Sequence, residues 1–146
     1  MRNNVIKISA YLHLIYFLYS FAPGHDAVLG EWYNQPKDAT LMLFEKDGKV
    51  FGKIHWLKEP NENGKPKVDK HNPDPNKRNT PAIGLVILKD FEKIKDGYWE
   101  NGTIYDPNNG KTYKSNLTLK DRNNLDVRGY VGFSLLGRTE SWTKKQ

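Results

Sequence analysis

The dipeptide Asp47-Gly48 most narrows the fold, because it lies between two runs rich in β-branched and aromatic residues, 39–46 and 49–57. Asp-Gly between such runs is the strongest short-range signal for a tight β-hairpin. The two runs are therefore predicted to be adjacent antiparallel strands. Alternate residues of the second run share one face. We take this face as inward; it carries Val50, Gly52, Ile54 and Trp56.

Short β-rich runs separated by turn residues continue to the end of the chain, and no convincing amphipathic helix interrupts them. Further strands are predicted at 29–34, 81–88, 97–105, 111–120, 125–131 and 135–143, with a short link at 89–96 and a bulge at Gly102. The count is about eight strands, which predicts an all-β protein. A closed sheet of about eight strands either fills with side chains or holds one small ligand.

The first and last predicted strands carry residues that suit a closing contact. Gly30 lets the chain turn sharply into the sheet while Trp32 faces inward. A guanidinium stacked on an indole face contributes about 0.5–2 kcal/mol, so Arg138 is a candidate partner for Trp32. This pairing would make the end strands neighbours and the sheet a single closed antiparallel up-and-down barrel. The alternative is that Trp32 is ordinary core and Arg138 a solvated charge.

Residues 1–24 have the layout of a secretory signal peptide, with Arg2 and Lys7 ahead of an almost wholly apolar run at 8–22. Cleavage is expected between residues 22 and 27. The apolar run is shorter than the roughly 20 residues that a spanning helix needs, although an uncleaved membrane anchor is the alternative. The folded domain is thus expected at 25–146, in the periplasm or outside the cell.

The charge balance does not by itself indicate nucleic acid as a partner, and none is expected. The formal net charge is +6, but Arg2 and Lys7 belong to the signal segment, which leaves 21 of the 23 basic residues against 17 acidic ones. This excess is mild and evenly spread. The chain has no cysteine, which excludes disulfides, thiolate metal sites and a cysteine nucleophile. The domain must therefore be stable through its core alone.

Residues 58–80 are predicted to form a long polar loop, rich in proline, asparagine and lysine. Loops of this length in a compact domain are usually functional or mobile. Its side-chain oxygens crowd together, but the glycine and terminal glutamate of a calcium loop are missing, so a solvated loop is favoured and no metal is expected. The oxygen-bearing residues are Asp69, Asn72, Asp74 and Asn76, and the basic residues are Lys65, Lys67, Lys70, Lys77 and Arg78.

No catalytic constellation is visible. His55 and His71 lack close metal-ligand spacing, and there is no nucleophile elbow or phosphate-binding glycine loop. An enzyme built in the barrel would need a perturbed carboxylate facing the cavity, such as Asp106 or Glu100, and the sequence gives no sign of one. We therefore expect neither catalysis nor a cofactor.

Several motifs together resemble one bacterial family. They are Gly30-x-Trp32, Gly102-x-Ile104-Tyr105-Asp106-Pro107-x-x-Gly110-Lys111-x-Tyr113, Leu125-x-Val127-Arg128-Gly129-Tyr130-x-Gly132 and Gly137-Arg138-Thr139-x-x-Trp142. Over residues 27–143 the chain resembles the secreted family called domain of unknown function 2147 (DUF2147). The resemblance implies a lipocalin-like, calycin-type barrel exported by a Gram-negative bacterium, and it supplies neither reaction nor ligand. It also implies that Trp32 packs against Arg138, as in lipocalin relatives.

Binding is the leading functional hypothesis. Several aromatic residues on strands are expected to face the interior and to line an apolar pocket with a few orienting polar groups, namely Trp56, Trp99, Tyr105 and Tyr113. Core filling is the alternative for these residues. Arg128 should point outward by alternation, but a bulge near Gly129 could turn it toward the mouth, where it would favour an anionic head group.

Two functional classes follow from these observations. The first is a carrier or sensor of a small hydrophobic or amphipathic molecule, with no nucleic acid and no stable membrane insertion after signal removal. The second is a protein-interaction module, an inhibitor or a binder of envelope or host partners, that acts through the 58–80 loop.

Overall fold

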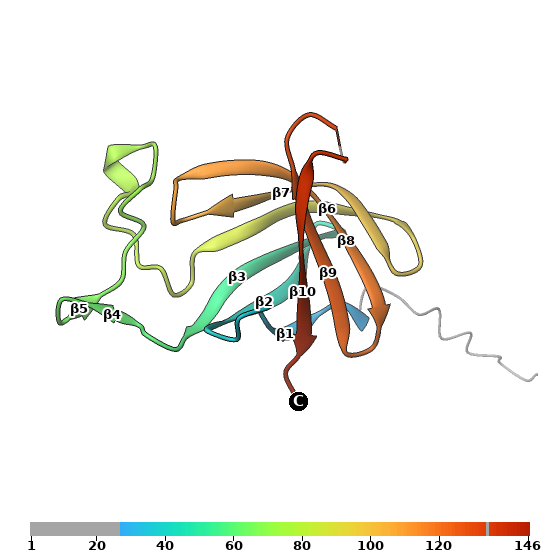
Figure 1. Ribbon diagram of the computed structural model, residues 1–146, viewed down its shortest axis with the longest axis horizontal. Helices are drawn as coiled ribbons and strands as arrows, with labels where there is room; N and C mark the ends of the chain where they lie inside the picture. The colour runs from blue at the N-terminus through green and yellow to red at the C-terminus, as the bar shows by residue number, and fades with distance from the viewer. Residues whose placement is uncertain (1–26, 134) are drawn as a thin grey trace, which may run out of the picture.

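A computed structural model describes residues 27–133 and 135–146, and it shows eight strands closed into an antiparallel barrel (Figure 1). The barrel strands are β1 (Gly30–Tyr33), β2 (Ala39–Lys46), β3 (Lys49–Leu57), β6 (Val86–Lys95), β7 (Tyr98–Asp106), β8 (Lys111–Asp121), β9 (Asn124–Tyr130) and β10 (Gly137–Lys144). Their order around the barrel is β1-β10-β9-β8-β7-β6-β3-β2. The predicted closed all-β barrel is confirmed, whereas the predicted signal peptide lies outside the described residues.

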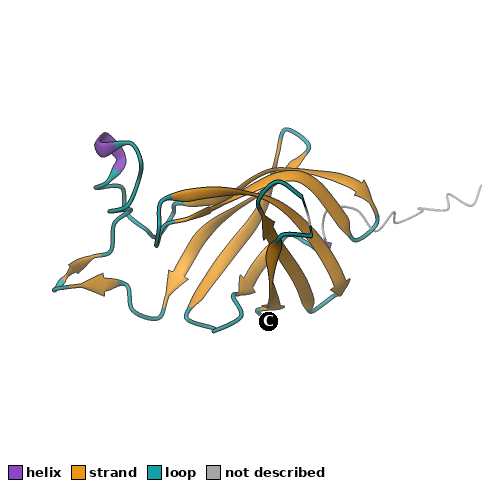
Figure 2. Cartoon of the chain, turned by 45° about the horizontal axis from the view of Figure 1, so that its top comes forward, coloured by secondary structure: helices purple, strands orange, loops and turns teal. Residues whose placement is uncertain are grey.

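The barrel has two different ends. One end, here the closed end, carries the tight turns 47–48, 96–97 and 122–123 together with residues 28–30. The opposite end, the open end, carries the longer connections 34–38, 58–85, 107–110 and 131–136. In the described residues, the segment 58–85 holds the small strands β4 (Asn61–Glu62) and β5 (Lys65–Pro66) and the 3₁₀ turn η2 (Pro75–Lys77), and it projects to one side of the barrel (Figure 2).

The hairpin at Asp47-Gly48 forms as predicted. Lys46 pairs with Lys49, and both turn residues have positive φ, 52° for Asp47 and 75° for Gly48. Two positive φ values are the requirement of the type I′ turn, whose twist matches that of the flanking strands. The hairpin therefore fixes β2 beside β3, with Leu43 opposite Gly52.

Strand β6 differs from its prediction. It was expected at 81–88 and followed by a link, but it runs from Val86 to Lys95. Residues 81–82 instead bind the long loop, since Pro81 bridges to Val68 and Ala82 N–H donates to Lys67 O at 2.9 Å. Residues 84–85 bond to Ile54 of β3, because Gly84 N–H donates to Ile54 O and Ile54 N–H donates to Leu85 O. The charged residues of 89–96 mask the strand in the sequence, because they face solvent on a two-faced sheet.

Trp32 closes the barrel at the closed end. Its side chain is fully buried, and its indole N–H donates to Val28 O at 2.8 Å. The Lys144 ammonium lies 4.5 Å from the ring centroid and also donates to Leu29 O. Gly30 has a φ of 107°, which residues with a side chain rarely adopt. The sharp entry into β1 therefore depends on this glycine.

The expected contact between Trp32 and Arg138 is wrong, because Lys144 takes that place. Trp32 pairs with Lys144 across β1 and β10, and Arg138 lies six residues earlier, about 20 Å along an extended strand. Arg138 is exposed at the open end, where its Nη2 lies 3.6 Å from Glu140 Oε1. A cation thus stacks on the closing tryptophan, but the last strand supplies a lysine.

The hydrophobic core fills the half of the barrel nearer the closed end. Fully buried side chains from seven of the eight barrel strands meet there, together with Val28 before β1: Val28, Trp32, Leu43, Val50, Leu88, Phe91, Trp99, Leu117 and Leu125. Phe91 packs so closely over Gly102 that a Cβ at this position would lie 2.4 Å from its ring. The register also shifts between Trp99 and Gly102, at the predicted bulge. With this half packed, free space is left toward the open end.

Candidate functional site

A cavity of about 1240 Å³ opens at the open end of the barrel. Its inner wall is apolar and comes from five strands, β2, β3, β6, β9 and β10. The buried side chains of these strands that line it are Leu41, Ile54, Ile87, Val127 and Trp142. Because these residues belong to the core cluster, the cavity reaches into the barrel rather than lying on its surface.

Charged side chains of both signs surround the mouth of this cavity. The basic residues are Lys58, Lys67, Lys70 and Arg138, with His71 beside them, and the acidic residues are Asp38, Glu59, Glu62, Asp106 and Glu140. Two of these residues form an ion pair, since Lys70 Nζ lies 2.8 Å from Glu62 Oε1. The site thus combines an apolar interior with a polar rim, an arrangement that suits a ligand with one apolar and one polar part.

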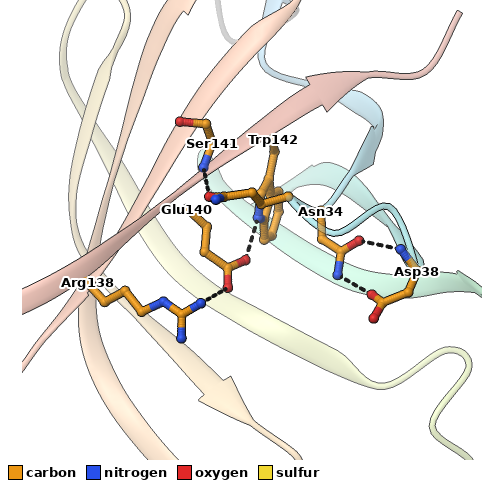
Figure 3. Close-up of polar contacts among 7 residues, drawn as sticks. Asn34, Asp38, Arg138, Glu140, Ser141 and Trp142 are labelled. Atoms are coloured by element: carbon orange, nitrogen blue, oxygen red, sulfur yellow. Dashed lines mark hydrogen bonds and ion pairs between the residues drawn. The ribbon is translucent and has the colours of Figure 1, made fainter.

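Strand β10 places a short chain of polar contacts on the cavity wall (Figure 3). The Trp142 indole N–H donates to Glu140 Oε2 at 3.3 Å, and Arg138 Nη2 approaches the other oxygen of the same carboxylate at 3.6 Å. On the neighbouring β1–β2 turn, Asn34 Nδ2 donates to Asp38 Oδ1 at 2.6 Å, and Asp38 N–H donates back to Asn34 Oδ1 at 3.1 Å. Both groups orient oxygen atoms at the rim.

The long loop is anchored to the barrel by Asp69. This residue is fully buried, and its carboxylate accepts hydrogen bonds from the Tyr105 hydroxyl and the Asn72 amide, both at 2.7 Å. Its backbone N–H donates to Thr80 O at 2.9 Å. Burial and the hydrogen bond to the Asp69 carboxylate raise the pKa of Tyr105 to about 12. A buried carboxylate is stable only with such partners, so the contact fixes the loop on β7.

A second anchor lies at the β7–β8 turn. Gly110 has a φ of 71°, and a Cβ at this position would lie only 2.0 Å from His71 O. Only glycine allows the loop backbone to approach the turn so closely. Asp69 contacts β7 and His71 contacts this turn, so the loop is held beside the barrel. Glu59, Glu62 and Lys67 therefore form part of the cavity rim.

Two of the predicted aromatic residues line the cavity, Tyr105 and Tyr113. The Tyr105 hydroxyl is engaged with Asp69, and the Tyr113 hydroxyl accepts a hydrogen bond from Asn109 Nδ2 at 3.0 Å. Trp99 is not among the lining residues, because it is 1% exposed within the core of the closed half.

Trp56 also lies outside the cavity lining, contrary to its expected inward face. It is 40% exposed and makes an edge-to-face contact with Tyr33, with 6.5 Å between ring centroids. The cause is a register shift, since Leu41 pairs with Ile54 but Thr40 pairs with Trp56. An extra residue in β3 reverses the alternation, and Leu57 lines the cavity in its place.

Arg128 is likewise not among the lining residues, in agreement with its alternation rather than with a turn toward the mouth. Its Nη1 donates to Thr139 Oγ1 at 2.9 Å and its Nη2 to Leu135 O at 3.3 Å. The arginine on the rim is Arg138. Because this rim mixes both charges, the structure does not add to the case for an anionic ligand.

Several lining residues had been assigned no role from the sequence, among them Leu41, Ile87, Glu140 and Trp142. The alternation of Leu41 and Leu43 on one face of β2 was an available signal for the first. No sequence pattern indicated that the Glu140 carboxylate would lie beside Trp142. In the described part of the chain, no group of three or more His, Asp or Glu residues could hold a metal, and no helix is long and apolar enough to cross a membrane.

The combination of a closed antiparallel barrel, one packed end and one hollow end defines the class of the fold. A solved structure with the same architecture is that of protein HP1028 from the human pathogen Helicobacter pylori, which is described as belonging to the lipocalin family. The TM-score is 0.71 at 24% sequence identity, and the match covers 81% of this chain and 82% of that chain. The fold is thus lipocalin-like.

The family itself follows from the sequence match. The model of DUF2147, described as an uncharacterized protein conserved in bacteria, matches residues 30–144, so the chain belongs to this bacterial family. The resemblance stated from the motifs is confirmed. No curated protein matches the chain.

Proposed function

We propose that the protein binds a small, partly apolar molecule in the cavity at the open end of the barrel and acts as a carrier or sensor in the periplasm or outside the cell. The observation that carries the proposal is the continuity of the cavity with the core through Leu41, Val127 and Trp142. An apolar space that reaches core residues is favourable for an apolar group, which leaves water on entering it. The signal-peptide pattern of residues 1–24 supports export.

The polar rim is the basis for the expected shape of the ligand. An apolar body would occupy the space among the aliphatic side chains, while a polar end would meet the Glu140 carboxylate and the Arg138 guanidinium. A fatty acid or a similar amphipathic molecule has this division. Tyr113 would contact the ligand between the two regions, because it lines the cavity with an aromatic ring and a hydroxyl.

A titration with a fluorescent fatty acid tests this proposal, with displacement by a library of lipids and aromatic molecules. Gly129 lines the cavity, and a Cβ there would point at Ile104 and Tyr113, so Gly129→Leu fills the space. We expect Gly129→Leu and Tyr113→Ala to weaken binding by roughly tenfold or more, about 1.4 kcal/mol.

Trp56→Ala is the matched control, because it removes an aromatic residue outside the cavity lining. It should leave the affinity within about twofold of the wild type. Failure of every library member to bind, or an equal loss in Trp56→Ala and Gly129→Leu, would contradict a ligand in the cavity.

A further inference from the structure

In the connection between β9 and β10, the described residues, 131–133 and 135–136, carry a concentration of exposed apolar side chains. Val131, Phe133, Leu135 and Leu136 have between 66% and 88% of their surface exposed. Figure 1 shows this connection standing clear of the barrel beyond the ends of β9 and β10. We call it the apolar loop. Monomeric proteins rarely expose contiguous apolar surface of this kind unless it binds something.

Exposed apolar side chains are also unevenly divided between the ends of the barrel. In the described residues, the large hydrophobic side chains that are exposed lie at the open end, with one exception. The members at the open end are Trp56, Ile83, Val131, Phe133, Leu135 and Leu136, and the exception is Ile94. The asymmetry places the apolar surface around the cavity mouth.

Basic side chains lie on the strands directly behind the apolar loop. Lys114 pairs with Tyr130, the last residue of β9, and Arg138 follows the first residue of β10. Arg128 donates to Leu135 O at 3.3 Å and so braces the loop from below. We call these three residues the basic collar. Arg138 Nη2 lies 3.6 Å from Glu140 Oε1, and Lys114 is exposed.

We propose that the apolar loop inserts into the surface of a bilayer that contains anionic lipids, with the basic collar at the level of the phosphates. Apolar side chains enter the acyl boundary while cations contact the head groups, which is the usual division at a membrane interface. A protein partner fits less well, because a standard protein interface buries about 800 Å² per side and the exposed apolar surface of this loop comes from four described side chains.

Docking of this kind would bring the cavity to the lipid surface. Val131 and Leu136 belong both to the apolar loop and to the lining of the cavity mouth. An amphipathic ligand could then pass between bilayer and barrel without crossing water. This consequence rests on the proposed function, whereas the docking itself depends only on the loop and the collar.

A single fluorescent label tests the insertion, because the chain has no cysteine of its own. Leu135→Cys, exported, purified and labelled with an environment-sensitive dye, should show a blue-shifted and stronger emission with phosphatidylglycerol vesicles. Ile94→Cys is the matched control, since Ile94 is 53% exposed at the closed end. The control should not respond, and about 0.5 M salt should weaken the response of Leu135→Cys. An unchanged Leu135→Cys signal, or an equal change at both positions, would overturn the proposal.

Vesicle co-sedimentation gives a second measurement. Phe133→Ser and Leu135→Ser should each weaken binding to phosphatidylglycerol vesicles by roughly tenfold or more, and vesicles of phosphatidylcholine alone should bind weakly. Neither residue lines the cavity, so fatty-acid binding without vesicles should be unchanged and separates this test from that of the proposed function. A dimer in sedimentation velocity that Phe133→Ser abolishes, with no vesicle binding, would assign the loop to a second copy of the chain and overturn the proposal.

Discussion

The two ends of the barrel use similar residue types for different purposes. At the closed end, Trp32 is fully buried, hydrogen-bonded to Val28 and covered by the Lys144 ammonium. On the inner wall of the cavity, Trp142 is also buried and lies opposite Leu125, but its indole N–H donates to the rim residue Glu140. The two buried tryptophans therefore differ in their surroundings, since Trp32 is enclosed by the core and its cation, whereas Trp142 borders the cavity and is connected to its polar rim.

The largest effect should come from removing the tryptophan of the closed end. Trp32→Ala leaves a cavity in the packed core that the surrounding side chains fill only partly, so we expect a loss of about 3–5 kcal/mol in the free energy of unfolding. Urea unfolding measures it, and the more conservative Trp32→Phe should lose less because it keeps most of the packing. An unfolding free energy unchanged in both variants would remove the distinction between the ends.

The anchor of the long loop should be the next most sensitive. Tyr105→Phe takes one donor from the buried Asp69 carboxylate, and hydrogen bonds to charged groups contribute about 1.5–3 kcal/mol. Amide hydrogen exchange should show lost protection in the backbone hydrogen bonds of the loop, such as Asp69 N–H to Thr80 O, while β2 and β3 stay protected.

Tyr98→Phe is the matched control, because it removes a 2.6 Å hydrogen bond from Tyr98 to Glu100, a partner that is not buried. Its cost should stay below about 1 kcal/mol, since solvent replaces the lost partner. Equal losses in the two variants would show that the loop is not held by Asp69.

Strongly alkaline pH should weaken the same anchor. The pKa of Tyr105 is raised from 10.0 to about 12 by burial and by the Asp69 carboxylate. The stability that this shift represents is fully present below pH 10 and is lost as the pH rises toward 12, because a phenolate would face a carboxylate. Urea unfolding of the wild type and Tyr105→Phe across this interval should converge. If the difference in unfolding free energy between the two proteins stayed constant over this pH interval, the hydrogen bond from Tyr105 to Asp69 would not be the anchor.

The smallest effect should come from the cation at the closed end. Lys144→Met keeps apolar cover on Trp32 but removes the cation and its hydrogen bond to Leu29 O, for a cost of about 0.5–1 kcal/mol. Burial lowers the pKa of Lys144, which offsets part of what the cation contributes. Lys53→Met, whose ammonium lies 5.8 Å from the Phe44 centroid on the barrel surface, is the control and should cost less in urea unfolding.

The sequence was sufficient for the barrel because its strands are encoded locally. Alternation and the Asp47-Gly48 turn place β2 and β3, and Gly30-x-Trp32 marks the closed end. The partner of Trp32 was assigned to Arg138 instead of Lys144, because it depends on the register between β1 and β10, which no local pattern specifies. The sequence predicted a cavity inside the barrel, but of the four aromatic residues expected to line it only Tyr105 and Tyr113 do so.

Two kinds of error in the site have physical causes. Trp56 was expected inward, but one extra residue in β3 reverses the alternation, and such a bulge leaves no clear mark in this run. In the sequence, nothing distinguishes Asp69 from the other polar residues of the 58–80 loop. Its burial depends on Tyr105, 36 residues later in the chain, so only the folded structure shows it.

Native mass spectrometry tests the central claim, that the open end holds a ligand and the closed end does not, most directly. Wild type and Gly129→Leu would be purified after export and incubated with the same lipid extract. The account predicts an extra mass on the wild type that is lost on mild denaturation and is absent from Gly129→Leu. A bare polypeptide mass for the wild type, or the same extra mass on both proteins, would contradict it.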